Sequence, residues 1–361
     1  MIIKPFKAVF PNINKIDSVE EFFNKVKEDY ITFNQKGYFH DPIDQAFFIY
    51  QICQDERKYT GIIGCLDVEG YSDGYIKKHE NTISEKEDRQ LQLLLHRKAA
   101  VKPVTLTYPS QSSIQTWIHT YIRKHPPTHT FVLQSKQKTH HIWAIKDTIS
   151  INTIQQLFQK MEKVYIADGH HRIATTSIAF QKFNHHHYNC FLCALFPTSD
   201  MDILDYNRIL KIPLDLNFID ILSHYFNMSI LPKGEKPKKK FELSLYYRKQ
   251  WFHLTWKKEI LPKSSSKIWL DAELLNKIIL KDILQIENVR KDPRISYIDG
   301  TKDIAAIEKK VNKSENSAAF CLAAVQMEEL LRIADAGEIL PPKSTWFEPR
   351  MVNGMVVLEY E

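Results

Sequence analysis

The sequence predicts a mixed α/β fold, because short apolar runs rich in β-branched residues alternate with amphipathic helical patterns. The clearest alternation is at 164–172, where Val-Tyr-Ile-Ala leads through Asp-Gly-His-His-Arg into a helix-like segment. The chain has 361 residues, of which 43% are hydrophobic and 25% charged, which allows two or three domains with sizeable cores. We expect an α/β region at 1–150, a core at 151–230 and an α+β region at 231–361.

Helices and strands alternate through the first region. One helix begins after Asp17 or Ser18, and another begins at Ser84, where Ser-Glu-Lys-Glu has capping-box spacing, and ends near Ala100. Turn residues and apolar runs predict the other elements: strands at 46–53, 62–68 and 104–108, turns at 59–61 and 69–74, a helix at 114–121, and a hairpin at 130–133 and 140–145.

The later regions continue the α/β pattern. The basic stretch at 232–240 contains Pro and Gly and predicts an exposed loop. Gly337 is placed to end a helix. The remaining expected elements are a strand at 164–167 followed by a helix, a strand at 191–196, a hairpin at 241–247 and 251–256, a helix at 272–283 capped by Asp271, a strand at 318–325 and a helix at 327–336.

The Asp-Gly-His-His-Arg segment has the composition of a phosphate-binding turn. Gly169 lets the backbone turn sharply beside a ligand, and the first N–H groups of a helix attract anions. Arg172 offers a planar fork that suits phosphate, and His170 and His171 add donors whose charge changes near neutral pH. In the alternative, Asp168 only caps the helix and the histidines pack or face solvent.

A second candidate segment precedes the helix at Ser84. Glu80 is a candidate general base for a substrate hydroxyl, and His79 and Arg89 are candidate phosphate contacts. His79 and Thr82 are also assigned to substrate binding. The alternative is a charged loop that leads into a solvated helix.

Two further segments carry anion-binding side chains. Lys343, Ser344 and Thr345 follow a rigid Pro-Pro pair and resemble an anion clamp, although the glycines of a Walker loop are missing. Asn207 and Arg208 follow a predicted strand and are assigned to substrate contact. The alternatives are a simple polar turn and a surface arginine.

Several classes of protein are disfavoured. The net charge of +6 tolerates anionic ligands without requiring nucleic acid. The five cysteines suit a reducing compartment, and the pair Cys190 and Cys193 has no second pair that would complete a zinc site. Three adjacent imidazoles at 185–187 cannot converge on one metal in an extended chain, so we expect a loop there.

Hydrolase and membrane motifs are also missing. No His-Glu-x-x-His or Gly-x-Ser-x-Gly is present, so zinc and serine hydrolases lack support. The N-terminus does not have the form of a signal peptide, and no apolar run approaches the length of a membrane span. We therefore expect a cytoplasmic protein.

Three motifs resemble those of the family called domain of unknown function 1015. They are Ile-Ala-Asp-Gly-His-His-Arg at 166–172, Lys-His-Glu-Asn-Thr at 78–82 with Arg89 downstream, and Ala-Gly-Glu-Ile-Leu-Pro-Pro-Lys-Ser-Thr-Trp-Phe at 336–347 with Pro349, Arg350 and Gly354 after it. The turn at 168–172 is also similar to that of the ParB/sulfiredoxin-like superfamily. That superfamily includes free-serine kinases, chromosome-partition nucleotide switches and sulfiredoxin.

The resemblance implies a ParB/sulfiredoxin-like phosphate-binding core, enlarged by the N- and C-terminal regions. Asp168, Gly169, His170, His171 and Arg172 match the turn that holds nucleotide phosphates. Glu80 is our candidate for the carboxylate that activates the hydroxyl in the kinases. The reactive cysteine of sulfiredoxin is absent from the turn, and no helix-turn-helix module is evident, so sulfinic acid reduction and DNA binding are disfavoured.

These observations lead to one hypothesis with two alternatives. The chain would move phosphate between a nucleotide, or pyrophosphate, and a small hydroxyl substrate such as serine, with Mg²⁺ bridging phosphate oxygens. Glu80, Asp168 and His170 would be catalytic, and Arg89 and Lys343 would neutralise charge in one composite pocket. The alternatives are a phosphoserine phosphatase-like hydrolase and a nucleotide-binding regulator without turnover. A small phosphate-bearing ligand is the expected partner, and a homodimer is compatible with the sequence.

Overall fold

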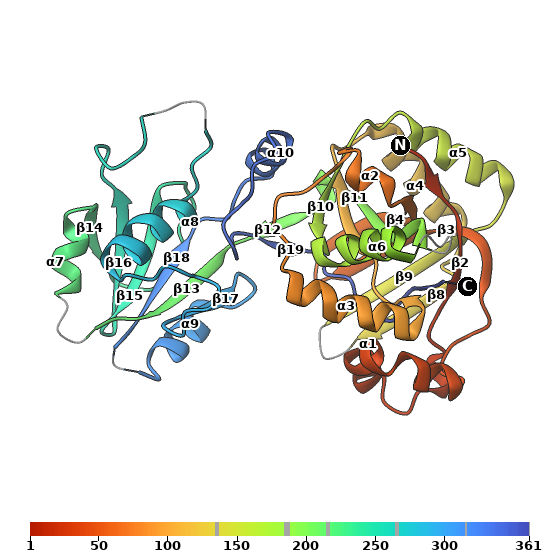
Figure 1. Cartoon of the computed structure of the whole chain (residues 1–361), viewed down its shortest axis with the longest axis horizontal. Helices are drawn as coiled ribbons and strands as arrows, with labels where there is room; N and C mark the ends of the chain where they lie inside the picture. The colour runs from red at the N-terminus through yellow and green to blue at the C-terminus, as the bar shows by residue number, and fades with distance from the viewer. Residues whose placement is uncertain (134–136, 184–187, 214–216, 264–266, 315, 361) are drawn as a thin grey trace. The chain divides into compact units, whose positions relative to one another are not determined.

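The computed structural model describes residues 1–133, 137–183, 188–213, 217–263, 267–314 and 316–360 (Figure 1). The chain folds into two compact units. Unit 1 is Met1–Asp202 together with Pro349–Glu361, and unit 2 is Ile203–Glu348. These units do not follow the three regions drawn from the sequence, because the C-terminal segment returns to the sheet of the N-terminal part.

Unit 1 is built on a twelve-stranded mixed sheet (Figure 1). Its main path runs β5-β10-β7-β11-β4-β3-β2-β20-β6, with β1 paired to β4, β9 paired to β3, and β8 paired to β9. The strands are β1 (Ile3–Lys4), β2 (Phe6–Val9), β3 (Ile43–Gln54), β4 (Arg57–Asp67), β5 (Ile76–Lys77), β6 (Ala99–Ala100), β7 (Val104–Tyr108), β8 (His129–Leu133), β9 (Lys138–Ile145), β10 (Val164–Asp168), β11 (Cys190–Pro197) and β20 (Val357–Glu359).

Helices surround this sheet. They are α1 (Val19–Gln35), α2 (Glu69–Ser72), α3 (Ser84–Arg97), α4 (Ser112–Lys124), α5 (Thr148–Gln159) and α6 (His170–Phe183). The helix expected after Asp17 or Ser18 is confirmed as α1, whose first turn is capped by Ser18 where its hydroxyl accepts from the Glu21 N–H at 3.4 Å. The central strands and the inner faces of α4, α5 and α6 share one apolar core, which fixes β10 and the start of α6 in place.

Most of the expected strands of unit 1 are confirmed, and several local expectations are corrected, including the turn at 69–74, where Glu69–Ser72 form α2. The turn expected at 59–61 is wrong, because these residues lie inside β4 and the β3–β4 turn is at Asp55, whose φ is +51°. The capping box at Ser84 is also wrong, because the helix is preceded by Ile83 and has no side-chain cap. α3 ends at Arg97, before Ala100, because Ala99–Ala100 pair with β20.

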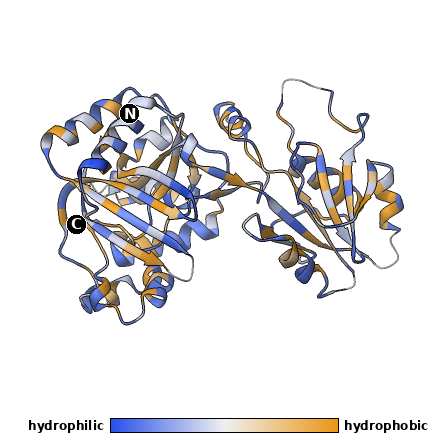
Figure 2. Cartoon of the chain, turned by 180° about the vertical axis from the view of Figure 1, so that it is seen from behind, coloured by the Kyte–Doolittle hydropathy of each residue, from blue (hydrophilic) through white to orange (hydrophobic). Residues whose placement is uncertain are grey.

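Unit 2 contains a six-stranded antiparallel sheet in the order β14-β16-β15-β18-β13-β17. The strands of unit 2 are β13 (Tyr206–Lys211), β14 (Phe226–Leu231), β15 (Glu242–Tyr247), β16 (Gln250–Trp256), β17 (Ile295–Asp299) and β18 (Ser317–Leu322), and β12 (Asp202–Leu204) pairs with β19 (Trp346–Glu348). The helices are α7 (Phe218–Ser223), α8 (Asp271–Leu274), the π-helix η5 (Leu275–Ile283), α9 (Ile304–Val311) and α10 (Met327–Asp335). Figure 2 shows hydrophobic residues along the strands of both sheets.

The expected hairpin of unit 2 is confirmed as β15 and β16, joined by Arg248 and Lys249 with φ of +49° and +62°. The end of α10 before Gly337, whose φ is +71°, is also confirmed. The cap at Asp271 is wrong. Leu270 precedes the helix, and the Asp271 carboxylate instead accepts from the backbone N–H of Phe241 at 3.0 Å.

Two negative findings hold for the described part of the chain. None of its helices is long and apolar enough to span a bilayer, and none of its His, Cys, Asp and Glu side chains form a group of three that could hold a metal ion. All five cysteines are described and are free thiols. The three histidines at 185–187 lie outside the described residues.

Candidate functional site

The turn after β10 is confirmed as a strand-to-helix junction. β10 ends at Asp168 and α6 begins at His170, so Gly169 alone connects them. Gly169 has a φ of +110°, and a Cβ at this position would lie 2.6 Å from Nη2 of Arg172. A side chain here would meet both backbone strain and a steric clash, which explains the glycine.

The Asp168 carboxylate is surrounded by three cations within unit 1. Its oxygens lie 2.9 Å from Nη2 of Arg172, 3.1 Å from Nη2 of Arg350 and 3.5 Å from Nζ of Lys102. Arg172 is held further by the carbonyls of Asp168 and Pro103, at 3.2 and 3.1 Å. We call these four side chains the Asp168 cluster. It holds one negative and three positive charges, and this excess favours a bound anion.

The electrostatics of the cluster follow from its burial. Burial raises the pKa of Asp168, but the charges of Arg172, Lys102 and Arg350 outweigh it, so the pKa lies well below its usual range and the carboxylate stays ionised. Burial and the charge of Arg172 lower the pKa of Lys102 to about 8, despite the opposing charge of Asp168. Lys102 is therefore mostly charged at neutral pH. A bound anion would raise its pKa and so favour the charged form further.

A second group of polar side chains lies beside the turn. His170 is 4% exposed, and its Nε2 accepts from the backbone N–H of His79 at 3.4 Å. The two imidazole rings meet edge to face at 4.5 Å. Nδ1 of His170 lies 3.9 Å from the Glu80 carboxylate, which remains 41% exposed. The structure thus brings His79, Glu80 and His170 together, and of these three Glu80 has the exposed reactive group.

The two histidines are neutral at physiological pH. Burial lowers the pKa of His79 to about 4, and burial together with His79 holds the pKa of His170 well below its usual value. With Nε2 of His170 acting as an acceptor, its proton resides on Nδ1, which faces Glu80. His170 therefore orients the segment that carries Glu80.

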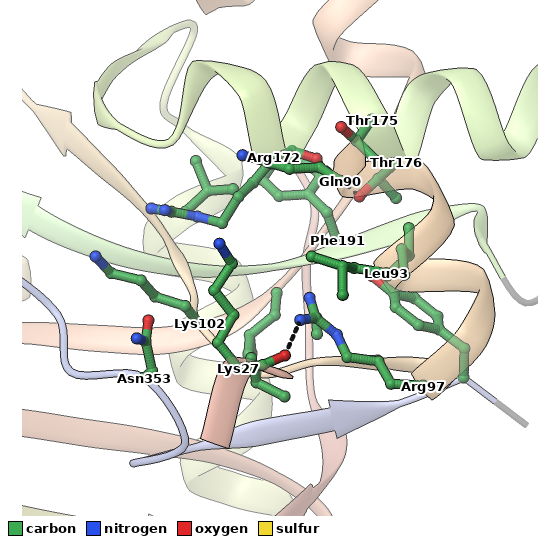
Figure 3. Close-up of a pocket in the computed structure, with 16 residues that line it drawn as sticks. Lys27, Gln90, Leu93, Arg97, Lys102, Arg172, Thr175, Thr176, Phe191 and Asn353 are labelled. Carbon is green, nitrogen blue, oxygen red and sulfur yellow. Dashed lines mark hydrogen bonds between the residues drawn. The ribbon is translucent and has the colours of Figure 1, made fainter. Parts of the chain in front are cut away.

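A cavity of about 260 Å³ adjoins the Asp168 cluster and shares Lys102 and Arg172 with it (Figure 3). Among the described residues that line it, four are cationic and none is acidic. Its remaining wall is largely apolar, with amides and hydroxyls at the edges. Arg97 is oriented by its bonds to the carbonyls of Ala99 at 2.6 Å and Lys27 at 3.0 Å. Cationic side chains beside an apolar wall suit a ligand that joins a flat ring to phosphate.

The other site residues predicted in unit 1 do not join the Asp168 cluster. Arg89 is exposed on α3, and no contact described for it reaches the Asp168 cluster, although its neighbour Gln90 lines the cavity. Thr82 is partly buried in the loop before α3. His171 follows His170 on the first turn of α6, and its carbonyl accepts from the hydroxyl of Thr175 at 2.7 Å.

The remaining predicted residues belong to unit 2. Nζ of Lys343 lies 3.3 Å from the hydroxyl of Tyr206 and 5.1 Å from the centre of its ring. Ser344 is buried and donates to the carbonyl of Pro341 at 2.7 Å, and Thr345 beside it is partly buried. The structure therefore places these three side chains in a folded segment of unit 2 and the turn at 168–172 in unit 1.

Asn207 and Arg208 are both buried in unit 2. The Asn207 amide donates to Asp205 at 2.5 Å and accepts from the Leu322 N–H at 3.2 Å. Both the nitrogen and the oxygen of the amide are therefore used in hydrogen bonds within unit 2. Arg208 is 1% exposed, which contradicts the alternative of a surface arginine. Its side chain lines a cavity of its own.

Lys102, Arg350 and Arg97 are the site residues that sequence reasoning missed. Lys102 reaches Asp168 because β7 runs antiparallel to β10, which sets the start of one beside the end of the other. Arg350 lies 182 positions from Asp168 in the sequence and comes from the C-terminal segment. A cation just before an apolar strand was the one signal that pointed to Lys102.

The family described as "Protein of unknown function (DUF1015)" matches residues 6–281, and no curated protein matches the sequence. A point mutant of a free serine kinase in complex with ADP is 14% identical, with 81% of this chain and 91% of that chain covered and a TM-score of 0.41.

Two other solved structures are similar to the same degree. A conserved hypothetical protein from Pyrococcus furiosus is 13% identical, with 80% of this chain and 93% of that chain covered and a TM-score of 0.40. SbnI with a C-terminal truncation, from Staphylococcus aureus, is 10% identical, with 81% and 85% covered and a TM-score of 0.42.

Proposed function

The chain belongs to the family of unknown function DUF1015, and we propose that it transfers phosphate between a nucleotide and the hydroxyl of a small molecule, with serine as the acceptor. One observation carries this proposal. The Asp168 cluster has two more positive charges than negative ones, and it borders a cavity with an apolar wall. The nucleotide and the acceptor are our assignment from this chemistry.

In this proposal the ligand lies along the cavity. A nucleotide base would contact the apolar wall formed by Leu93, Val101 and Phe191, and the phosphates would reach Lys102 and Arg172. The guanidinium is already oriented by Asp168 and by the Pro103 carbonyl. Donors held in place before the ligand arrives lose little freedom on binding, which favours affinity.

The transfer step would use Glu80 as the general base. The acceptor hydroxyl oxygen attacks phosphorus, a new P–O bond forms, and the bond to the nucleotide breaks with its electron pair leaving on the nucleotide oxygen. The hydroxyl proton passes to Glu80, which is exposed enough to meet a substrate. His170 would act as a positioning residue, and the cations of the cluster would stabilise the transferred charge.

Magnesium enters the proposal only with the nucleotide. The described residues provide no group of three metal-ligating side chains, and Asp168 already faces three cations. The described residues by themselves therefore do not fit a resident Mg²⁺ ion. Mg²⁺ commonly binds through substrate phosphates and water, and nucleotide phosphates would carry it here.

The test is formation of phosphoserine by the full chain, followed by ³¹P NMR with Mg²⁺, serine and ATP, ADP or pyrophosphate as donors. We expect phosphoserine with at least one donor. Glu80→Gln should reduce the rate at least about 100-fold, the range of general-base contributions. Glu85→Gln, an exposed change on α3, is the matched control and should retain the rate.

The other outcomes identify different functions. Phosphate release from phosphoserine without any nucleotide would replace the transferase with a hydrolase. ADP that raises the melting temperature of the wild type but not of Arg172→Ala, with no turnover from any donor, would replace it with a nucleotide-binding regulator. Lys102→Gln repeats the binding test if Arg172→Ala does not fold.

A further inference from the structure

Unit 2 contains a cavity of about 80 Å³ at the end of β18, where the chain turns into α10. Its apolar lining includes Leu270, Leu322 and Val325, and its polar lining comes from Tyr206, Arg208, Lys240, Asp271, Gln326, Glu329 and Ser344. One buried water needs about 10–15 Å³ of such space. The cavity therefore holds roughly five to eight non-hydrogen atoms.

Arg208 enters this cavity with most of its donors unused. The side chain is 1% exposed, and within the described residues its single hydrogen bond runs from Nη1 to the carbonyl of Tyr206 at 2.6 Å. Nε and Nη2 are buried without a hydrogen-bond partner in the same part of the chain, and the guanidinium carbon lies 5.8 Å from the centre of the Tyr297 ring. Buried donors of a charged group that bond to nothing destabilise a fold, so a bound group that accepts from both would stabilise it.

Asp271 supplies a buried negative charge in the same cavity. It is 6% exposed, and one of its carboxylate oxygens accepts from the Phe241 N–H at 3.0 Å. Burial raises its pKa to about 6, against the opposing bond from the Phe241 N–H, so it is ionised at neutral pH. The described contacts include no ion pair between Arg208 and Asp271.

The other two charges in the lining neutralise each other. Nζ of Lys240 bonds one carboxylate oxygen of Glu329, and the other oxygen accepts from the Gln326 N–H at 3.2 Å. One positive and one negative charge therefore remain in the cavity, separated from each other. A ligand that carries one charge of each sign would compensate both.

We propose that this cavity binds a small α-amino acid as a zwitterion. Its carboxylate would accept from Nε and Nη2 of Arg208, and its ammonium group would donate to Asp271. Glycine, alanine and serine have five to seven non-hydrogen atoms, which matches the volume (roughly five to eight). A phosphate would place its negative charge beside Asp271 and leave that carboxylate uncompensated. The inference does not rest on the proposed phosphate transfer, because all of these residues belong to unit 2.

The first experiment is calorimetric titration of the full chain with glycine, L-alanine and L-serine, without nucleotide. The comparison ligands are 3-hydroxypropionate, which lacks the ammonium group, and ethanolamine, which lacks the carboxylate. We expect at least one amino acid to bind, and each comparison ligand to bind at least tenfold more weakly. Absence of amino-acid binding, or equal binding of 3-hydroxypropionate, would overturn the inference.

The second experiment locates the binding with variants. Arg208→Lys keeps the charge but loses the planar fork, and Asp271→Asn keeps an acceptor for the Phe241 N–H but loses the charge. Each should weaken amino-acid binding at least tenfold, with the fold checked by circular dichroism. Lys211→Met, an exposed change on the same strand as Arg208, should leave it unchanged.

A third arm separates this inference from the proposed function. Arg172→Ala alters the Asp168 cluster of unit 1 and should leave amino-acid binding intact. Binding that is lost in Arg172→Ala and retained in Asp271→Asn would place the amino acid in unit 1. That result would overturn the present inference and would support serine as the acceptor.

Discussion

Arg172 in unit 1 is partly buried and Arg208 in unit 2 is almost fully buried, and the two arginines differ in their partners. Arg172 bonds the Asp168 carboxylate and two carbonyls, and two further cations share that carboxylate. Arg208 bonds a single carbonyl, and its nearest counter-charge in the cavity, Asp271, is not paired with it. The Asp168 cluster therefore has surplus positive charge. In the unit 2 cavity the charges of Arg208 and Asp271 sum to zero, but no ion pair joins them.

The difference shows how a binding site can be recognised by the charge that it lacks. The Asp168 cluster lacks negative charge, which a phosphate supplies. The Arg208 cavity lacks a bridge between two opposite charges, which a zwitterion supplies. Because one site lacks negative charge and the other lacks a group that joins two opposite charges, the two sites should respond differently to mutation, pH and salt. Each response tests the comparison.

The largest effect is expected from Asp168→Asn. Removal of one partner from a buried ion pair costs about 3–5 kcal/mol of unfolding free energy, and here three cations lose their shared partner. Because the folded pKa of Asp168 is lowered, its stabilising contribution is present above about pH 4 and is lost at lower pH. Urea unfolding at pH 7 measures the loss.

The control for Asp168→Asn is Asp67→Asn, which removes the partly exposed ion pair with Lys4. Exposed pairs contribute about 0–1 kcal/mol, so this variant should remain close to the wild type. Equal losses of unfolding free energy in the two variants would show that the Asp168 cluster contributes no more stability than a surface ion pair.

Asp271→Asn is expected to stabilise the protein. The folded pKa of about 6 lies above the ordinary value of 3.8, so the folded state holds the proton more tightly, and stability falls as pH rises from about 4 to 6. At pH 7.5 the ionised carboxylate costs about 3 kcal/mol, which the amide removes. Lys240 and Glu329 also act on this carboxylate, in opposite directions, and both are retained.

Urea unfolding at pH 4 and pH 7.5 checks this prediction, with Asp282→Asn on η5 as an exposed control. The stabilisation should appear at pH 7.5 and vanish at pH 4, and the control should differ from the wild type by less than about 0.5 kcal/mol. If Asp271→Asn were less stable than the wild type at pH 7.5, the ionised carboxylate would be stabilising the fold. That result would contradict the description of Asp271 as a buried charge that is not paired with Arg208.

Gly169→Ala should lower the free energy of unfolding by a smaller amount and should also weaken ligand binding. A φ of +110° is unfavourable for alanine, at about 1–3 kcal/mol, and the new methyl group would displace Arg172. We expect lower stability and weaker binding of ADP. Gly74→Ala is the matched control, because Gly74 has a φ of +82° but open space around it. It should lose stability and keep ADP affinity; loss of affinity in both variants would contradict this account.

Salt should produce the smallest and most selective difference. The screening length falls from about 10 Å at 0.1 M salt to about 3 Å at 1 M, which weakens attraction between a net positive site and an anion. Titrations at 0.1 and 1 M NaCl should show ADP binding weakened several-fold and alanine binding changed less than about two-fold. Equal salt dependence would remove the electrostatic distinction between the two sites.

Local features of the fold were predictable from the sequence. The junction at Asp168 and the β15–β16 hairpin depend on residues that are adjacent in the chain, so apolar runs and turn residues identify them. The cap at Asp271 was predicted wrongly because the partner of its carboxylate, the Phe241 N–H, is distant in the sequence. A helical pattern marks where a helix lies but does not show which distant backbone N–H a neighbouring carboxylate will meet.

The composition of the sites was predictable only in part. Glu80, His170 and Arg172 were identified because their types and local spacing carry chemistry, and the structure brings them to one turn. Lys102 and Arg350 were not, because strand order and the return of the C-terminus decide their neighbours. Arg208 was assigned to ligand contact, but its burial could not be seen from a sequence in which arginine is usually exposed.

The return of the C-terminal segment also constrains how the protein can be made. β20 lies between β2 and β6 in the sheet of unit 1, and Arg350 completes the Asp168 cluster. Ile203–Glu348 are therefore synthesised between the two parts of unit 1. During translation unit 2 can fold as it emerges from the ribosome. Unit 1, by contrast, lacks both β20 and Arg350 until the segment from Pro349 onward has left the exit tunnel, so its sheet and the Asp168 cluster are completed after unit 2 has been synthesised.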